Sequence, residues 1–529
     1  MGAPAKPTWS RDTVAARILA GDSIFILHGR VIRVPQSWLG AHPGGALTIL
    51  HFIGRDASDE IEAYHQEHTI KKMYSYTVGV VDIGEEGWIP LQPPINTGWV
   101  RKADLDGAMH WHNEAAAVYS AENTELSPSS QILLVKKDET VTATGPSLQS
   151  LQTPPSPLSL KIQAQHSAAY KELHRRIVDA GLYQTRYIAG YGPEVARYIL
   201  FAVTSYVAYQ SQWYFFSAVS LGALWHQLVF TVHDLGHLGV THDWVKDRVI
   251  SIIIADWIGG LSIGWWVQNH NIHHVVTNHP SHDPDIQHLP FFAITPDFFR
   301  SLYSSYYKRE MTFDRASQFF IGMQHRLFYV IMSLARFNLY RLSYLHLWTT
   351  RNEPIKVRGG RWAWWLEVVG LAFWWLWYGS VIRGCGSWQK GLMYLLVSNM
   401  VPSPLHVQIV LSHYSRSTAD LGPAESFAHR QLRTTSDVIC HPSVAFLHGG
   451  LHLQVTHHFF PRLPRHNLLE ASHLVKEYAN EQGLEYAEFG FLDGNSDVRS
   501  TLKGVADQLK LMRMVADAEI REAIETKRN

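Results

Sequence analysis

The chain has 529 residues and a mass of 60.2 kDa, enough for at least two domains because one hydrophobic core rarely serves more than about 300 residues. Its 46 basic and 46 acidic residues cancel before histidine is counted, so no nucleic-acid partner is expected. Two cysteines exclude a disulfide scaffold and any thiolate-held zinc or iron–sulfur cluster, and the 31 histidines are the residues that stand out.

Residues 1–90 are predicted to form a small α+β domain. A short apolar strand at 23–27 turns and returns as a partner strand at 31–34. A His-Pro-Gly-Gly motif at 42–45 follows this pair, and His65 comes after an acidic helical segment. A lone histidine in a Pro-Gly turn is an ordinary surface residue as often as it is a haem ligand. Two imidazoles from facing helix–loop corners, however, can bind both sides of a haem iron. The two glycines permit a sharp turn and a close approach to the flat macrocycle.

This N-terminal block resembles cytochrome b5, a small haem protein that carries single electrons. The resemblance implies that His42 and His65 are the two axial ligands of haem b and that Gly44 and Gly45 lie against the haem. It also implies that the domain passes electrons and does not bind oxygen, because both axial positions of the iron are filled.

Residues 91–165 are predicted to be a linker. The stretch from 120 to 160 is rich in Ser, Pro and Thr and is too polar to pack, so the linker is expected to be largely disordered from residue 120. The domain that follows, residues 166–529, is predicted to be all α-helical, because long apolar, aromatic and histidine-rich segments replace this composition.

Apolar lengths in the second domain predict about four transmembrane helices, since one crossing needs about 20 residues. The charge-free stretch 198–233 is long enough for two crossings with a tight turn, and 364–382 and 391–415 provide the third and fourth. Residues 249–268 are also apolar, but Asp256 lies in their middle, and a charge at the centre of a bilayer is costly. This segment is therefore expected to enter the membrane shallowly or to turn back.

Three histidine clusters border these apolar segments. On a helix, residues three and four positions apart lie on one face, so each cluster presents its imidazoles to a common point. One such cluster is common on surface helices, but three clusters, each beside an apolar segment, are not expected by chance. Imidazole binds iron, copper or zinc, and seven imidazoles exceed what one tetrahedral zinc ion takes, which favours two metal ions. The candidates are His233 and His237, then His270, His273 and His274, then Gln454, His457 and His458.

The three clusters can share one site only if they lie on the same side of the bilayer. Two crossings before His233 return the chain to its starting side, and a segment that turns back keeps His270 there. Two further crossings return the chain before Gln454. The haem-type domain, the metal site and the amphipathic helices expected at 467–529 are therefore predicted to lie on one side.

The histidine clusters resemble those of membrane fatty-acyl desaturases. Gln454 in the place of a histidine, together with a fused cytochrome b5-like domain, is similar to the front-end group of these enzymes. Two stretches resemble the fungal Δ8 sphingolipid desaturases most: DPDIQHLPFFAI at 283–294 and FLHGGLHLQVTHHFFPRLPRHN at 446–467.

The resemblance implies an O2-dependent enzyme that introduces a Δ8 double bond into the long-chain base of sphingolipids or ceramides. It implies two iron ions at the histidine clusters, with His413 and Gln454 as further candidate ligands, although His413 could as well cap its apolar helix. Electrons would come from NADH through NADH-cytochrome b5 reductase and the fused haem domain. The expected partners are this reductase, the bilayer and a sphingolipid or other acyl lipid. The expected location is the endoplasmic reticulum or a related endomembrane, with both termini cytosolic.

Two other readings fit the same residues. Within the same chemistry, a Δ5/Δ6 front-end fatty-acyl desaturase or a lipid hydroxylase would use the same di-iron site. In a different class, the chain would be a non-catalytic membrane electron carrier in which the histidine clusters are inert. Lipid products separate the first two from a Δ8 desaturase, and a variant of a cluster histidine such as His273 tests the carrier.

Overall fold

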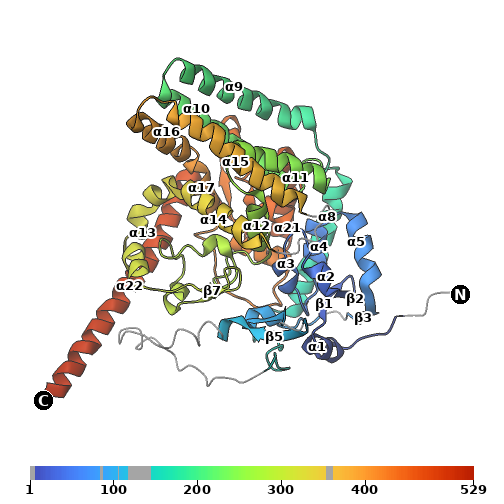
Figure 1. Cartoon of the computed structure of the whole chain (residues 1–529). Coiled ribbons are helices and arrows are strands. Elements are labelled where there is room, and N and C mark those ends of the chain that lie inside the picture. The colour runs from blue at the N-terminus through green and yellow to red at the C-terminus, as the bar shows by residue number, and fades with distance from the viewer. Residues whose placement is uncertain (1–5, 84–86, 105–106, 117–143, 353–360, 529) are drawn as a thin grey trace.

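The computed structural model describes residues 6–83, 87–104, 107–116, 144–352 and 361–528. Two parts lie against each other (Figure 1): a small α+β domain at the N-terminal end and a larger helical domain. Long apolar helices gather at one end of the helical domain, and shorter helices connect them to the small domain. The order expected from the sequence, an α+β domain followed by a helical membrane domain, is confirmed. The second domain was expected to be all-α, but it also contains two short two-stranded sheets, so it is mostly helical.

The small domain is built on a three-stranded antiparallel sheet in the order β1-β2-β3. Side chains of β1 alternate between two apolar cores, with Ile24 and Ile26 in one and Phe25 and Leu27 in the other. The strands predicted at 23–27 and 31–34 are therefore confirmed. The elements are α1 (Arg11–Leu19), β1 (Ser23–Leu27), β2 (Arg30–Val34), α2 (Gln36–Leu39), α3 (Leu47–Leu50), α4 (Ser58–Tyr64), α5 (Glu67–Met73) and β3 (Thr77–Val80).

The segment expected to be a linker contains a β-hairpin next to the small domain, β4 (Trp99–Ala103) paired with β5 (Met109–Asn113). On either side of the hairpin, Leu91 and Leu151 are fully buried in the core that contains Ile24. Both ends of this segment are thus tied to the small domain. The disorder expected from residue 120 falls in part on 120–143, which lie outside the described residues. Residues 144–165 are described, and they include the buried Leu151 and the start of a helix at Leu160.

Within the described residues, three helical stretches are long and apolar enough to cross a membrane. They are α10 (Tyr214–Gly236), α15 (Trp362–Arg383) and the pair α16 (Trp388–Met400) and α17 (Ser403–Leu411). The outward face of α15 exposes tryptophan, phenylalanine and leucine side chains, as expected for a helix that contacts lipid.

The first crossing expected from the sequence lies in α9 (Gly192–Gln210), which is not among those three. α9 nevertheless runs antiparallel to α10 over most of its length, since the hydroxyl groups of Tyr198 and Thr231 are 2.7 Å apart and Ser205 Oγ donates to Ser217 O at 3.0 Å. The small domain and the C-terminal end of α10 both lie beside α12. The chain must therefore reach the far end of α10 before Tyr214, and α9 takes it there.

The residues expected to turn back form a bent pair of helical segments. α11 (Trp244–Ile252) continues as the π-helical turn η4 (Ile253–Ile258), and α12 (Ile263–Val275) leaves it at a bend of 114°. The bend brings the ring of His270 to 5.3 Å from that of His233, at the end of α10. This geometry agrees with a segment that returns to the side from which it started.

A buried carboxylate fixes this bend. Glu367 of α15 pairs with Arg248 of α11 at 2.6 Å. The same carboxylate accepts hydrogen bonds from the Ser262 hydroxyl and from the Gly264 backbone N–H at the start of α12. Glu367 is 2% exposed, so a single charged group joins three elements inside the protein.

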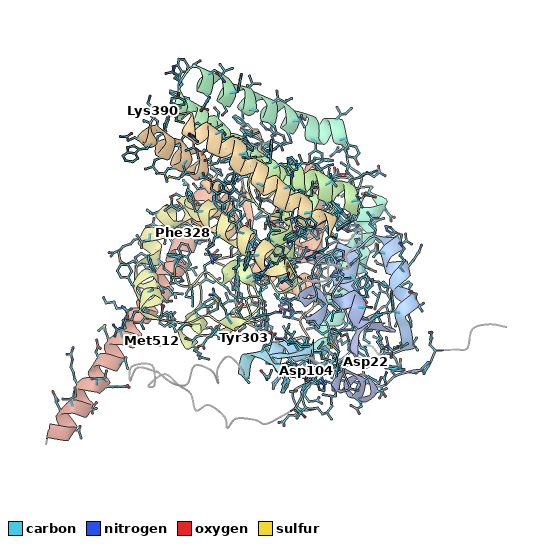
Figure 2. All side chains as sticks on the ribbon, in the orientation of Figure 1. Asp22, Asp104, Tyr303, Phe328, Lys390 and Met512 are labelled. Atoms are coloured by element: carbon cyan, nitrogen blue, oxygen red, sulfur yellow. The ribbon has the colours of Figure 1, made fainter. Side chains whose placement is uncertain are left out.

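The remaining elements complete the helical domain. α22 packs against α13 up to about Met512 and then extends away from the body, where its side chains are exposed (Figure 2). These elements are α8 (Leu160–Asp179), η3 (Tyr187–Tyr191), β6 (Tyr303–Ser304), β7 (Arg309–Glu310), α13 (Arg315–Ser333), α14 (Ala335–Thr350), α18 (Phe427–Thr434), β8 (Asp437–Ile439), α19 (Ala445–His448), α20 (Gln454–Phe459), α21 (Leu468–Glu481), β9 (Glu488–Gly490) and α22 (Phe491–Arg528).

Candidate metal centre

The three histidine clusters converge into two groups of imidazoles, all buried. In each group one nitrogen from every member lies within 4.8 Å of the others, a spacing that a shared metal ion requires. The helical spacing on α10 and α12 puts the histidines of each cluster on one helix face. The first group is His233, His237, His270 and His457, and the second is His273, His413 and His458.

His274 lies between the two groups. Its Nε2 atom is 3.0 Å from Nε2 of His270 and 3.1 Å from Nε2 of His457, both in the first group. Its ring stacks on that of His458, in the second group, with centres 4.1 Å apart. All seven histidines predicted from the clusters, and His413 as well, therefore occupy one continuous site.

The Nε2 atoms of these rings indicate where a metal ion would bind. The Nε2 atoms of five of them are buried and have no hydrogen-bond partner among the described residues. A buried polar atom without a partner costs about 1–3 kcal/mol, so this many together are expected only where a ligand supplies the missing bonds. The donor set therefore fits a pair of metal ions. The five are His233, His237, His273, His413 and His458.

The Nδ1 atoms of three of these rings are held by hydrogen bonds. His273 Nδ1 lies 2.9 Å from the carboxylate of Asp283, and His458 Nδ1 lies 2.9 Å from Oε1 of Gln431. His413 Nδ1 lies 3.2 Å from a backbone carbonyl, that of Thr434. Because Nδ1–H donates to each of these oxygens, Nε2 is the nitrogen of each ring that is available to a metal ion.

Sequence reasoning missed Asp283 and Gln431. Asp283 follows the second cluster in the segment His282-Asp283-Pro284-Asp285, and this repeat of acidic residues is the signal that could have identified it. Its carboxylate also accepts the backbone N–H of Asn278 at 2.7 Å, which fixes it beside His273. Gln431 lies on α18 with no motif around it, so only the fold reveals it.

A second buried network lies behind His233. Asp234, its neighbour in sequence, accepts hydrogen bonds from Arg465 Nε at 2.7 Å and from the Tyr191 hydroxyl at 2.8 Å. Arg465 also donates to Thr231 of α10 at 2.6 Å. The segment after α20 is thereby anchored to the end of α10, which brings His457 next to His233, with ring centres 4.4 Å apart.

Gln454 begins α20 and is 2% exposed. Its Oε1 atom has no hydrogen-bond partner within the described parts of the chain. An amide oxygen in this state can bind a metal ion, so Gln454 stays a candidate ligand.

The imidazoles on α20 are in the form that binds metals. Burial, followed by the proximity of other imidazoles such as His233 and His413, lowers the pKa of His457 and His458 well below the ordinary value. Both rings are therefore neutral at physiological pH, and a neutral imidazole has the free lone pair that a metal ion needs.

His42 and His65 face each other in the small domain. Their ring centres are 6.1 Å apart, close to the roughly 6 Å expected when two imidazoles bind one metal at about 2 Å from opposite sides. His42 Nδ1 lies 3.1 Å from the carbonyl of Gly45 and His65 Nδ1 lies 3.2 Å from that of Ile61, which directs both Nε2 atoms to the gap. Burial lowers the pKa of His65 to about 3, so this ring is neutral. The pair fits a haem iron.

The two glycines after His42 are needed for this arrangement. Gly45 has φ +87°, a backbone conformation that side chains rarely adopt. A Cβ atom on Gly44 would lie 3.1 Å from the ring of His42 and 3.4 Å from the side-chain amide of Asn271 on α12. The turn that carries His42 thus packs directly against the helix that carries the second histidine cluster.

The small domain is docked on α12. Ile272, Val275 and Val276 share one apolar core with small-domain residues, among them Phe52 and Ile61. Further contacts link the domain to the loop after α20, where Arg462 donates to the carbonyl of Ala63 at 3.1 Å. The haem pair and the metal groups therefore lie on opposite faces of one helix.

Comparisons with known proteins agree with this architecture. Residues 211–490 match the family model "Fatty acid desaturase", and residues 10–82 match "Cytochrome b5-like Heme/Steroid binding domain". The chain is 40% identical to a Delta 8-(E)-sphingolipid desaturase of Emericella nidulans, with 95% of each chain covered. It is 35% identical to the Delta 8-(E)-sphingolipid desaturase of Candida albicans, with 96% and 97% covered, and 28% identical to Delta(8)-fatty-acid desaturase 2 of Arabidopsis thaliana, with 93% and 91% covered.

The two matched regions coincide with the two parts of the structure. The region from 211 to 490 contains every member of both imidazole groups, and the region from 10 to 82 contains the facing pair His42 and His65. The chain belongs to the fatty acid desaturase family and carries a fused cytochrome b5-like domain.

Proposed function

We propose that the chain is a membrane desaturase that introduces a Δ8 double bond of E geometry into the long-chain base of a sphingolipid. The observation that carries this proposal is the buried imidazole site with a haem-type domain docked on the helix that supplies three of its histidines. The regiochemistry and geometry follow the names of fungal relatives that are 35–40% identical over nearly the whole chain.

Two iron ions are held by the imidazole groups, with His274 between them and Gln454 as a further candidate. Iron bound there supplies an oxidant strong enough to remove hydrogen from an unactivated methylene, which side chains alone cannot do. Asp283, Gln431 and the Thr434 carbonyl hold the ligand rings in place. The ligands of the first ion are His233, His237, His270 and His457, and those of the second are His273, His413 and His458.

Haem b is held by His42 and His65 in residues 1–90, and dioxygen is the co-substrate of the domain formed by 166–529. NADH-cytochrome b5 reductase supplies electrons to the haem from the side of the membrane on which the small domain lies. That side is the cytosol and the membrane is the endoplasmic reticulum, with both termini cytosolic. The packing of the small domain on α12 supports this arrangement, because it keeps the haem and the imidazole site on one side.

Expression in a yeast host that makes no Δ8-unsaturated long-chain bases tests the proposal. Analysis of total lipids is expected to reveal a new E double bond at Δ8 of the long-chain bases. A new Δ5 or Δ6 double bond in fatty acids, or a new hydroxyl group, would instead assign the chain to the alternative substrate or reaction and overturn the proposal.

The variant His273→Ala separates an enzyme from an electron carrier. His273 belongs to the second imidazole group, far from the haem ligands in sequence. We expect this variant to make no unsaturated product while its haem absorbance stays intact. A carrier with inert histidines would keep its full electron-transfer function in the variant, and continued product formation would contradict the proposed site.

A further inference from the structure

One side chain links the haem ligands to the imidazole site. Tyr64 is the last residue of α4 and is bonded through the backbone to His65. On its other side, the ring of Tyr64 meets that of His274 edge-on, with centres 6.2 Å apart and planes at 87°. A single residue therefore touches both a ligand of the haem and a member of the metal site.

The end of α4 is held firmly in this position. Ala63 is fully buried in an apolar core with Phe459 and Phe460, which directly follow the third histidine cluster, and Tyr64 packs against the same core. The hydrogen bond from Arg462 to the carbonyl of Ala63 adds a polar link at this point. The distance between Tyr64 and His274 is thus fixed by the docking of the two domains.

The hydroxyl group of Tyr64 does not explain the presence of this residue. It is buried and has no hydrogen-bond partner among the residues that the structure describes. Tyr64 therefore acts through its aromatic ring, which meets His274 and packs against the apolar core.

We propose that Tyr64 carries the electron from the haem to the di-iron centre, along the path His65, Tyr64, His274. The proposal rests on the proposed function, because it requires a metal pair that takes electrons. In each passage the haem iron is oxidised from Fe²⁺ to Fe³⁺ and one iron of the pair is reduced from Fe³⁺ to Fe²⁺. No bond forms or breaks on the path. Two passages, two protons from water and two substrate hydrogens reduce one dioxygen to two waters.

A second contact between the domains offers the rival path. On the other side of the haem pair, the turn at Gly44 lies beside the amide of Asn271. Asn271 follows His270 on α12, but its side chain faces the small domain. The aromatic contact favours Tyr64, because its ring touches a member of the imidazole site itself and the Asn271 amide touches only the turn.

The experiment uses the full chain, loaded with haem and iron, in lipid nanodiscs with substrate. The haem is reduced, the sample is mixed with dioxygen, and haem reoxidation is followed by stopped-flow absorbance in wild type, Tyr64→Leu, Tyr64→Met, Tyr64→Phe and Asn271→Ala. Tyr183→Leu is the matched control, since this ring packs against the same apolar core without touching His274. Haem spectrum, haem midpoint potential and iron content are measured on every sample.

Tyr64→Leu is expected to slow haem reoxidation by about tenfold, in the range seen when a residue beside a metal ligand is lost. Its haem spectrum, midpoint potential and iron content are expected to match wild type. Tyr64→Phe keeps the ring and should reoxidise close to the wild-type rate, as should Tyr183→Leu. Tyr64→Met fills a similar volume with a flexible chain and serves if the leucine variant does not fold.

If haem is reoxidised at the wild-type rate in both Tyr64→Leu and Tyr64→Met, the proposed path is wrong. If reoxidation is slow in Asn271→Ala alone, the electron passes through the Gly44 turn and the Tyr64 path is likewise wrong. A midpoint potential that shifts with the rate would make Tyr64 a residue that tunes the haem and would also overturn the path. If the haem of the wild-type chain is not reoxidised at all, the proposed function fails. The two failures are therefore distinguishable.

Discussion

At the scale of single residues, the side chains behind the imidazoles set the direction of the ligand nitrogens. Asp283 is fully buried, accepts from His273 Nδ1 and from the Asn278 backbone, and so fixes one ring of the second group. Asp285 lies near the same ring at 3.8 Å and near His270 at 3.6 Å, but its side chain is 25% exposed. These two carboxylates form a matched pair for experiment.

We expect Asp283→Asn to reduce iron affinity by about 10- to 100-fold, because the carboxylate that orients His273 and raises its basicity is lost. Iron content of the purified protein after dialysis against a graded chelator measures this effect, with haem absorbance as the internal reference. Asp285→Asn is the control and should lose less iron. Equal iron retention in both variants would show that Asp283 does not position the ring.

His413 provides a second test at this scale. It is a member of the three-histidine group, so its loss leaves that group with two imidazoles besides His274. We expect His413→Ala to lower the iron content from about two ions per chain towards one, because the four-histidine group is untouched. Metal analysis of the purified chain decides this, and a content near two would remove His413 from the ligand set.

The spacing within the clusters was enough to predict which imidazoles converge, because helical periodicity places them on one face. It did not decide whether His413 joins them or caps its helix, since no second histidine stands beside it. The structure places its Nε2 in the second group. Gln431 could not be predicted at all, because its role depends on how α18 packs against α20.

At the scale of elements, the bend between α11 and α12 decides where the second cluster lies. Asp256 in 249–268 predicted a segment that turns back, but the bonds that Glu367 makes to both arms of the bend depend on contact with α15 and have no local signal. The hairpin at β4 and β5 lies in a stretch expected to be a linker. Its pairing depends on contact with the small domain, such as the bond from Arg101 to the carbonyl of Gly21 at 2.9 Å.

Glu367→Ala is expected to destabilise the protein strongly, because loss of one partner of a buried ion pair costs about 3–5 kcal/mol. The variant leaves Arg248 unpaired and the first turn of α12 without its acceptor. Thermal unfolding in detergent and iron content measure the two consequences. Glu367→Gln keeps an acceptor and should lose less stability, whereas equal melting temperatures in all three proteins would contradict this role of Glu367.

Glu425, just before α18, makes the stability of the helix that orients His458 depend on pH. Burial raises its pKa, but hydrogen bonds from His429 and Arg433 and the charge of Arg430 outweigh this and lower the pKa to about 2. A lowered pKa gives stability that is present above the ordinary value of 4.5 and is lost as the pH falls towards 2.

We therefore expect Glu425→Gln to melt below wild type at neutral pH, with a difference that shrinks as the pH falls below 4.5. Melting temperatures of both proteins across this pH range provide the measurement. A difference that does not change with pH would mean that the carboxylate charge makes no contribution.

At the scale of the whole molecule, the two-part architecture and the membrane helices could be predicted from composition and apolar length. The docking of the parts could not. Ile272, Val275 and Val276 are apolar residues among the histidines of α12, and on the sequence they are indistinguishable from ordinary core positions. Only the structure shows that they form the surface on which the small domain docks.

The end of α22 is expected to be dispensable. Leu502, Val505 and Leu509 are buried against α13 and its neighbours, whereas Leu511, Met514 and Val515 are exposed. A chain ending at Met512, the residue marked in Figure 2, should keep its melting temperature and its product yield. A chain ending at Val498 loses the buried leucines and should be markedly less stable, and equal effects of the two truncations would contradict this packing.

The docking of the small domain on α12 also affects how fast electrons reach the metal site in a membrane. An electron donor that must find its acceptor by lateral diffusion becomes limiting when both are scarce in the bilayer. Here the donor domain packs against the helix that carries part of the acceptor site. The effective concentration of donor at acceptor is therefore fixed by the fold and does not depend on how many protein molecules the membrane holds. Turnover per molecule should then be unchanged when the protein is diluted with lipid, or when the host lacks a free electron-carrier protein.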